Sequence, residues 1–120
     1  MEHELKYDEE NAIGVLIFKN HFLHKEVDPI FNEVKNMFEN KAYRQLLVVM
    51  SDTHNVENRD TREDTSEQLS KLKITEVAFV GGSAANRMIA RVLIKTGLIK
   101  INGDFFKTYD EAINWLKSKR

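Results

Sequence analysis

Apolar segments that alternate with stretches of helical periodicity are the strongest constraint on how this chain can fold. Three nearly continuous apolar runs have the length and the β-branched content of buried strands: AIGVLIFKN (12–20), RQLLVVMSD (44–52) and ITEVAFVGG (74–82). Strands that are separated by helices are typical of a mainly parallel sheet joined by right-handed crossovers. The pattern therefore predicts an α/β fold.

The two ends of the chain complete this pattern. The segment HELKYDEE (3–10) alternates polar and apolar residues, which predicts a half-exposed strand that pairs antiparallel with residues 12–20. A last short strand, DFFK (104–107), precedes a final amphipathic helix. We expect one domain over residues 1–120. Its mixed, mainly parallel sheet has an antiparallel N-terminal strand and about four helices in the order ββαβαβαβα, on both faces of the sheet or predominantly on one.

The helices between the strands differ in how clearly the sequence marks them. Residues 27–38 have apolar side chains at helical spacing, whereas residues 53–64 hold almost nothing to bury and suggest an exposed loop. Thr65 and Gln68 then suggest the capping box of a short helix. The helix after the third apolar run has five apolar side chains on the face that we expect to be buried: Ala85, Met88, Ile89, Val92 and Leu93.

Charge and composition exclude several classes of function. The 18 Lys and Arg residues nearly balance the 19 Asp and Glu residues, so no overall charge attracts nucleic acid or an anionic membrane. There are no cysteines, which excludes disulfides and thiolate chemistry. The start of the chain has no apolar signal core, and no apolar run approaches the roughly 20 residues of a membrane span. We therefore expect a cytoplasmic protein without a membrane span or a nucleic-acid partner.

The order of the elements, the segment ITEVAFVGG followed by a helix, and the ending FFKTYDEAINWL resemble the STAS fold. They are most similar to the stage II sporulation protein AA-like proteins, which typically end with a strand, a short turn and a helix containing EAxxWL. The resemblance covers roughly residues 12–118. It implies a small non-enzymatic domain that binds a protein partner or a small apolar or anionic ligand.

Some STAS relatives exchange partners when a serine in an Asp-Ser-Ser-Gly type turn is phosphorylated. The corresponding segment of this chain, MSDTHNVENRDTREDTSEQLS (50–70), has no Ser-Gly pair. The resemblance therefore extends to the fold and not to the phosphorylation site. Instead, carboxylates outnumber arginines from Asp52 to Glu67, and we expect this stretch to be a mobile loop that acts as a lid or docks a partner.

The corner after the third apolar run is a candidate anion site. Gly81, Gly82 and Ser83 lead into a helix N-terminus, where free N–H groups can bind an anion, and Arg87 lies one turn further on. The segment matches neither the P-loop nor the dinucleotide-binding pattern. We interpret it first as a tight strand-to-helix corner, with weak anion binding as the functional alternative.

A basic stripe is expected on the same helix. Arg87, Arg91 and Lys95 recur every four residues, on the side opposite Met88. A solvated face explains such a stripe. Docking of a protein partner, together with Asp52 at the neighbouring strand end, is the alternative.

Three strand ends also resemble a response-regulator receiver, in which an aspartate accepts phosphate beside a hydroxyl and a lysine: Asp52, Ser83 and Lys107. A receiver also needs an acidic pair at the end of its first long strand to hold magnesium, and this chain has Lys19 and Asn20 there. A receiver-like phosphoacceptor that uses Asp52 is the alternative function. Neither metal-ligand spacing nor a catalytic motif is present, so we expect no metal, no cofactor and no enzyme activity.

Four large apolar side chains are candidates for an apolar pocket: Met88, Phe105, Phe106 and Trp115. Such a pocket would suit the distant likeness of STAS domains to lipid-carrying CRAL-TRIO domains. Packing in the core is the simpler explanation, and any of these side chains left uncovered would form a dimer interface. The sequence thus predicts a STAS-like regulatory or ligand- and protein-binding module, with a homodimer as its commonest assembly.

Overall fold

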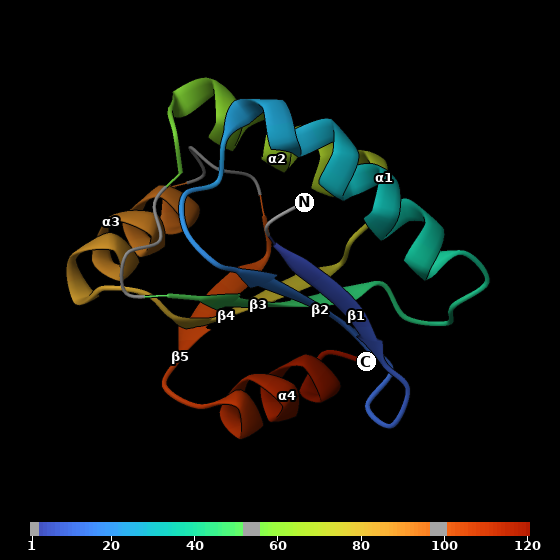
Figure 1. The fold of residues 1–120 in the computed structure, drawn as a ribbon. Coiled ribbons are helices and arrows are strands. Elements are labelled where there is room, and N and C mark those ends of the chain that lie inside the picture. Colours follow the sequence, from blue (N-terminus) through green and yellow to red (C-terminus); the bar gives the residue numbers. More distant parts are fainter. Residues whose placement is uncertain (1–2, 52–55, 97–100) are drawn as a thin grey trace.

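A five-stranded sheet forms the centre of the computed structural model, which describes residues 3–51, 56–96 and 101–120 (Figure 1). The strands lie side by side in chain order: β1 (Glu4–Asp8), β2 (Ile13–Phe18), β3 (Gln45–Met50), β4 (Glu76–Gly81) and β5 (Gly103–Phe106). β1 pairs antiparallel with β2, and the other neighbours pair parallel. The predicted mixed sheet with an antiparallel N-terminal strand is therefore confirmed.

Helices connect the parallel strands and end the chain. They are α1 (Val27–Phe38), α2 (Arg59–Lys71), α3 (Ala84–Lys95) and α4 (Tyr109–Ser118), and a short 3-10 helix, η1 (His24–Glu26), precedes α1. The four α-helices follow the predicted order, and η1 is an additional short element that the prediction did not include.

The strand order explains how the helices are distributed. The chain moves from β2 to β5 without reversing direction, and right-handed crossovers in one direction place their helices on one face of the sheet. Figure 1 shows this arrangement: α1, α2 and α3 lie above the sheet, and α4 lies below it. Helices thus cover both faces, but predominantly one.

Each face of the sheet has its own hydrophobic core. Successive side chains of a strand point to opposite faces, so Leu16 of β2 packs under α1 whereas Val15 packs against α4. Leu46 and Leu47 divide in the same way in β3. This is why the strands have nearly continuous apolar sequences, as expected for a sheet that is covered on both sides.

The segment predicted to be a loop up to residue 64 is largely helical. α2 begins at Arg59, because the side-chain oxygen of Asn58 accepts a hydrogen bond from the backbone N–H of Thr61 at 2.9 Å. Thr65 lies inside α2, where its hydroxyl donates to the carbonyl oxygen of Thr61 at 2.7 Å. The capping box at Thr65 and the loop over residues 59–67 were therefore wrong predictions, and Asp52 lies outside the described residues.

The predicted buried face of α3 was also wrong. Met88 is 71% exposed and Val92 55% exposed, and Ala85 is exposed too. α3 instead turns Arg87 and Arg91 towards the sheet, where these side chains bond to carbonyl oxygens of β4 and β5. The side chains of Ile89 and Leu93 lie outside the described part of the structure.

Candidate ligand-binding cavity

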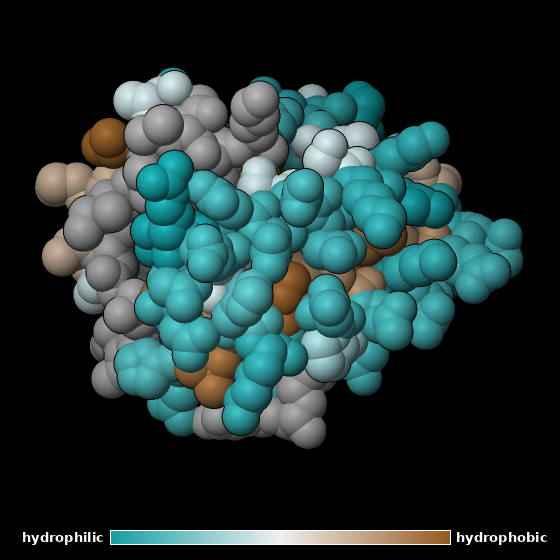
Figure 2. Space-filling model, turned by 90° about the horizontal axis from the view of Figure 1, so that it is seen from above, coloured by the Kyte–Doolittle hydropathy of each residue, from teal (hydrophilic) through white to brown (hydrophobic). Residues whose placement is uncertain are grey.

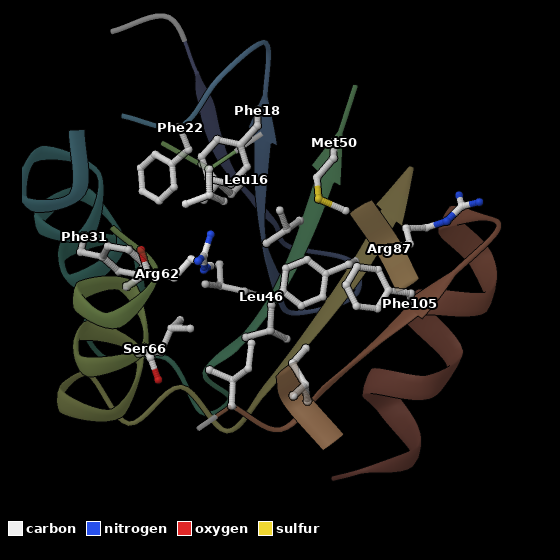
Figure 3. A pocket seen from close by; sticks show the side chains of 18 residues that line it. Leu16, Phe18, Phe22, Phe31, Leu46, Met50, Arg62, Ser66, Arg87 and Phe105 are labelled. Atoms are coloured by element: carbon white, nitrogen blue, oxygen red, sulfur yellow. The ribbon is translucent and has the colours of Figure 1, made fainter. Parts of the chain in front are cut away.

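A cavity of about 170 Å³ lies between the sheet and the layer formed by α1, α2 and α3 (Figure 3). Its surface is almost entirely apolar. Strands β2 to β5 supply the floor, with side chains that point to the upper face of the sheet: Leu16, Phe18, Leu46, Val48, Met50, Val77, Phe79 and Phe105.

The sequence of α2 explains why this space is not filled. The side chains that α2 turns towards the cavity follow helical spacing: Arg62, Thr65, Ser66 and Leu69. Only Leu69 is a sizeable apolar residue, whereas α1 packs five buried apolar side chains onto the core. Protein interiors are normally close-packed, so small and polar residues on an inward helix face leave space beneath them.

Aromatic rings close two sides of the cavity. Phe18 and Phe22 pack with ring centroids 4.7 Å apart, and the buried His3 ring makes a T-shaped contact with Phe18, with centroids 4.9 Å apart. On the other side, the rings of Phe79 and Phe105 stack with their centroids 4.8 Å apart. Such aromatic contacts hold their rings in defined orientations.

Hydrogen bonds of His3 and Glu26 hold the chain on the Phe22 side of the cavity. Nδ1 of His3 accepts a hydrogen bond from the backbone N–H of Lys19, and Nε2 of His3 lies 3.2 Å from Oε1 of Glu26. Burial raises the pKa of Glu26, but the N–H of Leu23 and the ring of His3 hydrogen-bond to its carboxylate and bring the pKa below its usual range. The N-terminal segment is thereby tied to the start of α1.

η1 is also tied to α2. The ring of His24 hydrogen-bonds to the carboxylate of Asp64, which raises the pKa of His24 above its usual value. The backbone N–H of His24 donates to Glu57, and the N–H of Glu57 donates to the carbonyl oxygen of Phe22 at 2.9 Å. These bonds position α2 relative to the strand end that carries Phe18.

Arg62 is the charged side chain that α2 directs over the cavity, and Figure 3 shows it extending towards the middle of the lining side chains. It is half-buried, and within the described residues its guanidinium has neither a hydrogen bond nor an ion pair. Other arginines nearby are engaged: Arg59 pairs with Glu63 at 2.9 Å, and Arg87 donates to the carbonyl oxygen of Gly81 at 3.5 Å. Arg62 is therefore a cation available to a ligand.

The glycine corner has a structural explanation. Gly81 and Gly82 have φ angles of +88° and +79°, and the N–H of Gly82 donates to the carbonyl oxygen of Met50 at 3.1 Å. A Cβ atom on Gly81 would lie only 2.2 Å from that oxygen. The glycines thus allow two backbones to approach closely, and Ser83 begins α3 by accepting a hydrogen bond from the N–H of Arg87.

The basic stripe does not form a single free surface. The side chain of Arg87 lines the cavity with its guanidinium directed away from the centre (Figure 3). Arg91 donates to the carbonyl oxygen of Phe105 and pairs with Asp104 at 3.5 Å. Lys95 is exposed at the end of α3. The structure thus separates the three residues that form one stripe in the sequence. Partner docking at Arg91 and Lys95 stays a prediction.

The receiver-like arrangement gains no support from the topology. In doubly wound sheets the strand order reverses, and the reversal opens the crevice that binds the ligand. In the described sheet the parallel strands follow each other in chain order, so no such crevice forms at the strand ends. Asp52 lies outside the described residues, and Lys107 is exposed.

Of the four side chains predicted for an apolar pocket, only Phe105 lines the cavity. Phe106 and Trp115 pack against each other on the α4 face of the sheet, and Met88 is exposed. Arg62 was missed because its segment was interpreted as a loop. The available signal was Asn58, a good N-cap residue, followed by the acidic Asp60 in the first helical turn.

The described parts of the chain hold neither a cluster of metal-binding side chains nor a membrane-spanning helix. Residues 3–51, 56–96 and 101–120 contain no group of three or more histidine or acidic side chains placed to hold a metal ion. Among the same residues, no helix combines the length and the apolar character needed to cross a bilayer.

Comparisons with known proteins place the chain in a family and support its fold. No curated protein matches the sequence significantly. An uncharacterized protein of the DUF3478 family from Shewanella loihica PV-4, solved with a SpoIIAA-like fold, superposes with a TM-score of 0.65 at 11% identity, covering 95% of this chain and 91% of that one. The STAS-like architecture expected from the sequence is thus supported. The model of a domain of unknown function, DUF7793, matches residues 10–120, and the chain therefore belongs to the DUF7793 family.

Proposed function

We propose that this protein is a non-enzymatic STAS-like binding module that holds a small apolar ligand between α2 and the sheet. The observation that carries the proposal is the apolar cavity of about 170 Å³. A cavity of about 150 Å³ lined by Leu, Ile and Phe can bind a molecule the size of benzene. A space of this kind beneath an otherwise well-packed helix layer supports a binding role.

The chemistry of the lining supports binding rather than catalysis. The polar residues that the described lining contributes are arginines and two hydroxyl residues, Thr65 and Ser66, and none is a carboxylate or a histidine. The Thr65 hydroxyl is bonded to the backbone of its own helix. A general base next to a ligand in the cavity is therefore absent from the described lining. The cysteine-free sequence favours a reducing compartment such as the cytoplasm.

A titration with toluene tests the proposal. We expect toluene to shift the amide NMR signals of residues around Val48 and Leu69, which line the cavity. Val48→Phe should fill the cavity and abolish these shifts, with Val48→Leu as a milder variant. Val49→Phe is the matched control, because Val49 is the next residue of β3 and packs on the α4 face. Binding that survives in Val48→Phe but is lost in Val49→Phe would place the ligand elsewhere and overturn the proposal.

Association through α3 is a second candidate function, favoured by the exposed side chains of Met88 and Val92. Figure 2 shows hydrophobic residues protruding at the edge where α3 lies, while hydrophilic side chains cover most of the face seen from above. Exposed apolar side chains at neighbouring helix turns favour a protein partner or a homodimer. Native mass spectrometry tests the homodimer: a dimer that becomes a monomer in Met88→Lys and Val92→Lys supports it, and a monomeric wild type contradicts it.

A further inference from the structure

We infer that the ligand of this cavity is a hydrophobic carboxylate about the size of one aromatic ring plus a short side chain, with Arg62 as the partner of its carboxylate. The inference rests on the proposed function and adds the chemical class of the ligand. Arylalkanoic acids such as phenylacetate and medium-chain fatty acids such as hexanoate belong to this class.

Arg62 has a charged side chain without a partner among the described residues. Arg62 is half-buried beside an apolar cavity. Where burial removes hydration from a guanidinium, hydrogen bonds or an ion pair normally compensate the loss. In the part of the chain that the structure describes, no such bond or pair reaches the Arg62 side chain. An anionic group of a ligand would supply the missing partner.

The two sides of the cavity differ in polarity. The sheet supplies an apolar floor, whereas α2 presents Arg62, Thr65 and Ser66 along the inward side of its helix. A ligand that fits both sides has one apolar part and one polar end. The volume of about 170 Å³ limits the enclosed apolar part to about the size of one ring, by comparison with the cavity of about 150 Å³ that encloses benzene.

The described lining offers one available cation to a ligand. Arg87 is the other arginine in the described lining, but its guanidinium points away from the centre and towards the carbonyl oxygen of Gly81 (Figure 3). One guanidinium matches one carboxylate, because its planar donors can form two parallel hydrogen bonds to the two oxygens. A doubly charged phosphate would leave more charge without a partner.

Calorimetric titration with two ligands of equal shape tests the inference. Phenylacetate carries the carboxylate, and phenylacetamide replaces it with a neutral amide. We expect the wild-type protein to prefer phenylacetate by at least about tenfold, since hydrogen bonds between charged groups are the strong ones. Arg62→Met, which keeps an unbranched side chain, should bind both ligands alike. Arg59→Met is the matched control, since Arg59 lies on the same helix and is exposed, and it should keep the preference.

The outcomes separate this inference from the proposed function. If toluene and phenylacetamide bind but phenylacetate binds no better, the ligand class is wrong and the apolar binding role stands. A preference that persists in Arg62→Met, or that disappears equally in Arg59→Met, also overturns the role of Arg62. If none of the three compounds binds, both proposals fail. Arg62→Gln serves as a second variant where Arg62→Met does not fold, and it too should lose the preference.

Discussion

The side-chain oxygen of Asn58 accepts two hydrogen bonds from Thr61, one from its backbone N–H at 2.9 Å and one from its hydroxyl at 2.8 Å. Thr61 is fully buried, so this pair fixes the first turn of α2 against the rest of the molecule. Arg62 is the next residue along the chain. The position of the charged group over the cavity therefore depends on how this turn is capped.

Replacing Asn58 by alanine should weaken both stability and ligand binding. The loss of an N-cap costs about 1–2 kcal/mol, and the buried hydroxyl of Thr61 would also lose its acceptor. Urea denaturation measures the free energy of unfolding. Thr108→Ala removes the equivalent cap of α4, on the opposite face, and should lower stability without lowering the affinity for toluene. An unchanged stability of Asn58→Ala would contradict the capping role.

Gly81→Ala should destabilise the protein more than Gly82→Ala. Both residues have positive φ, which costs a residue with a side chain about 1–2 kcal/mol. A Cβ at Gly81 would also lie 2.2 Å from the carbonyl oxygen of Met50, whereas a Cβ at Gly82 would first meet a flexible methionine carbon at 3.4 Å. Thermal denaturation of the two variants checks this order. Equal losses of melting temperature in the two variants would show that the protein relieves the crowding between a Cβ at residue 81 and the Met50 carbonyl oxygen without a loss of stability.

The strands could be predicted from the sequence because burial on both faces gives them continuous apolar runs, as Val15, Leu16, Leu46 and Leu47 show. α2 could not be predicted by periodicity, because its inward face covers a cavity rather than a core. Arg62, Thr65 and Ser66 occupy positions where large apolar residues would have given the helical signal.

The orientation of α3 on the sheet could not be predicted from periodicity either. Its apolar residues follow helical spacing, and the spacing alone does not say which side meets the sheet. In the folded protein Arg87 and Arg91 hydrogen-bond to backbone carbonyls of β4 and β5, and with this rotation of the helix Met88 and Val92 are exposed. Bonds between an arginine side chain and the backbone of a neighbouring strand have no signature in the periodicity of the helix.

His24 should make the stability of the protein depend on pH. The hydrogen bond with Asp64 raises the pKa of His24 in the folded state. Its stabilising contribution is therefore complete below the unfolded pKa of about 6.5 and disappears as the pH rises through the folded pKa. The melting temperature of His24→Gln should fall below that of the wild type at about pH 5.5 and match it at about pH 9. His21→Gln, an exposed neighbour, is the control. A deficit that is the same at both pH values would contradict the role of this pair.

Gln45 offers a test that separates folding from binding. Its buried amide donates to Glu76 at 2.8 Å and to the carbonyl oxygen of Leu116 at 2.7 Å, and so joins β3 to α4 on the face away from the cavity. Gln45→Ala should lower the free energy of unfolding by about 1–3 kcal/mol, because buried polar groups lose their partner. The affinity of the folded protein for toluene should stay unchanged. A large loss of affinity would mean that binding involves the α4 face.

Intermolecular NOEs between bound toluene and the methyl groups of the protein measure directly where the apolar ligand lies. We predict NOEs from the toluene ring to the methyl groups of Val48 and Leu46, which line the cavity under α2. Ile113 and Leu116, in the core of the opposite face, should give none. NOEs to Ile113 and Leu116 without any to Val48 and Leu46 would place the ligand on the α4 face and contradict binding in the cavity under α2.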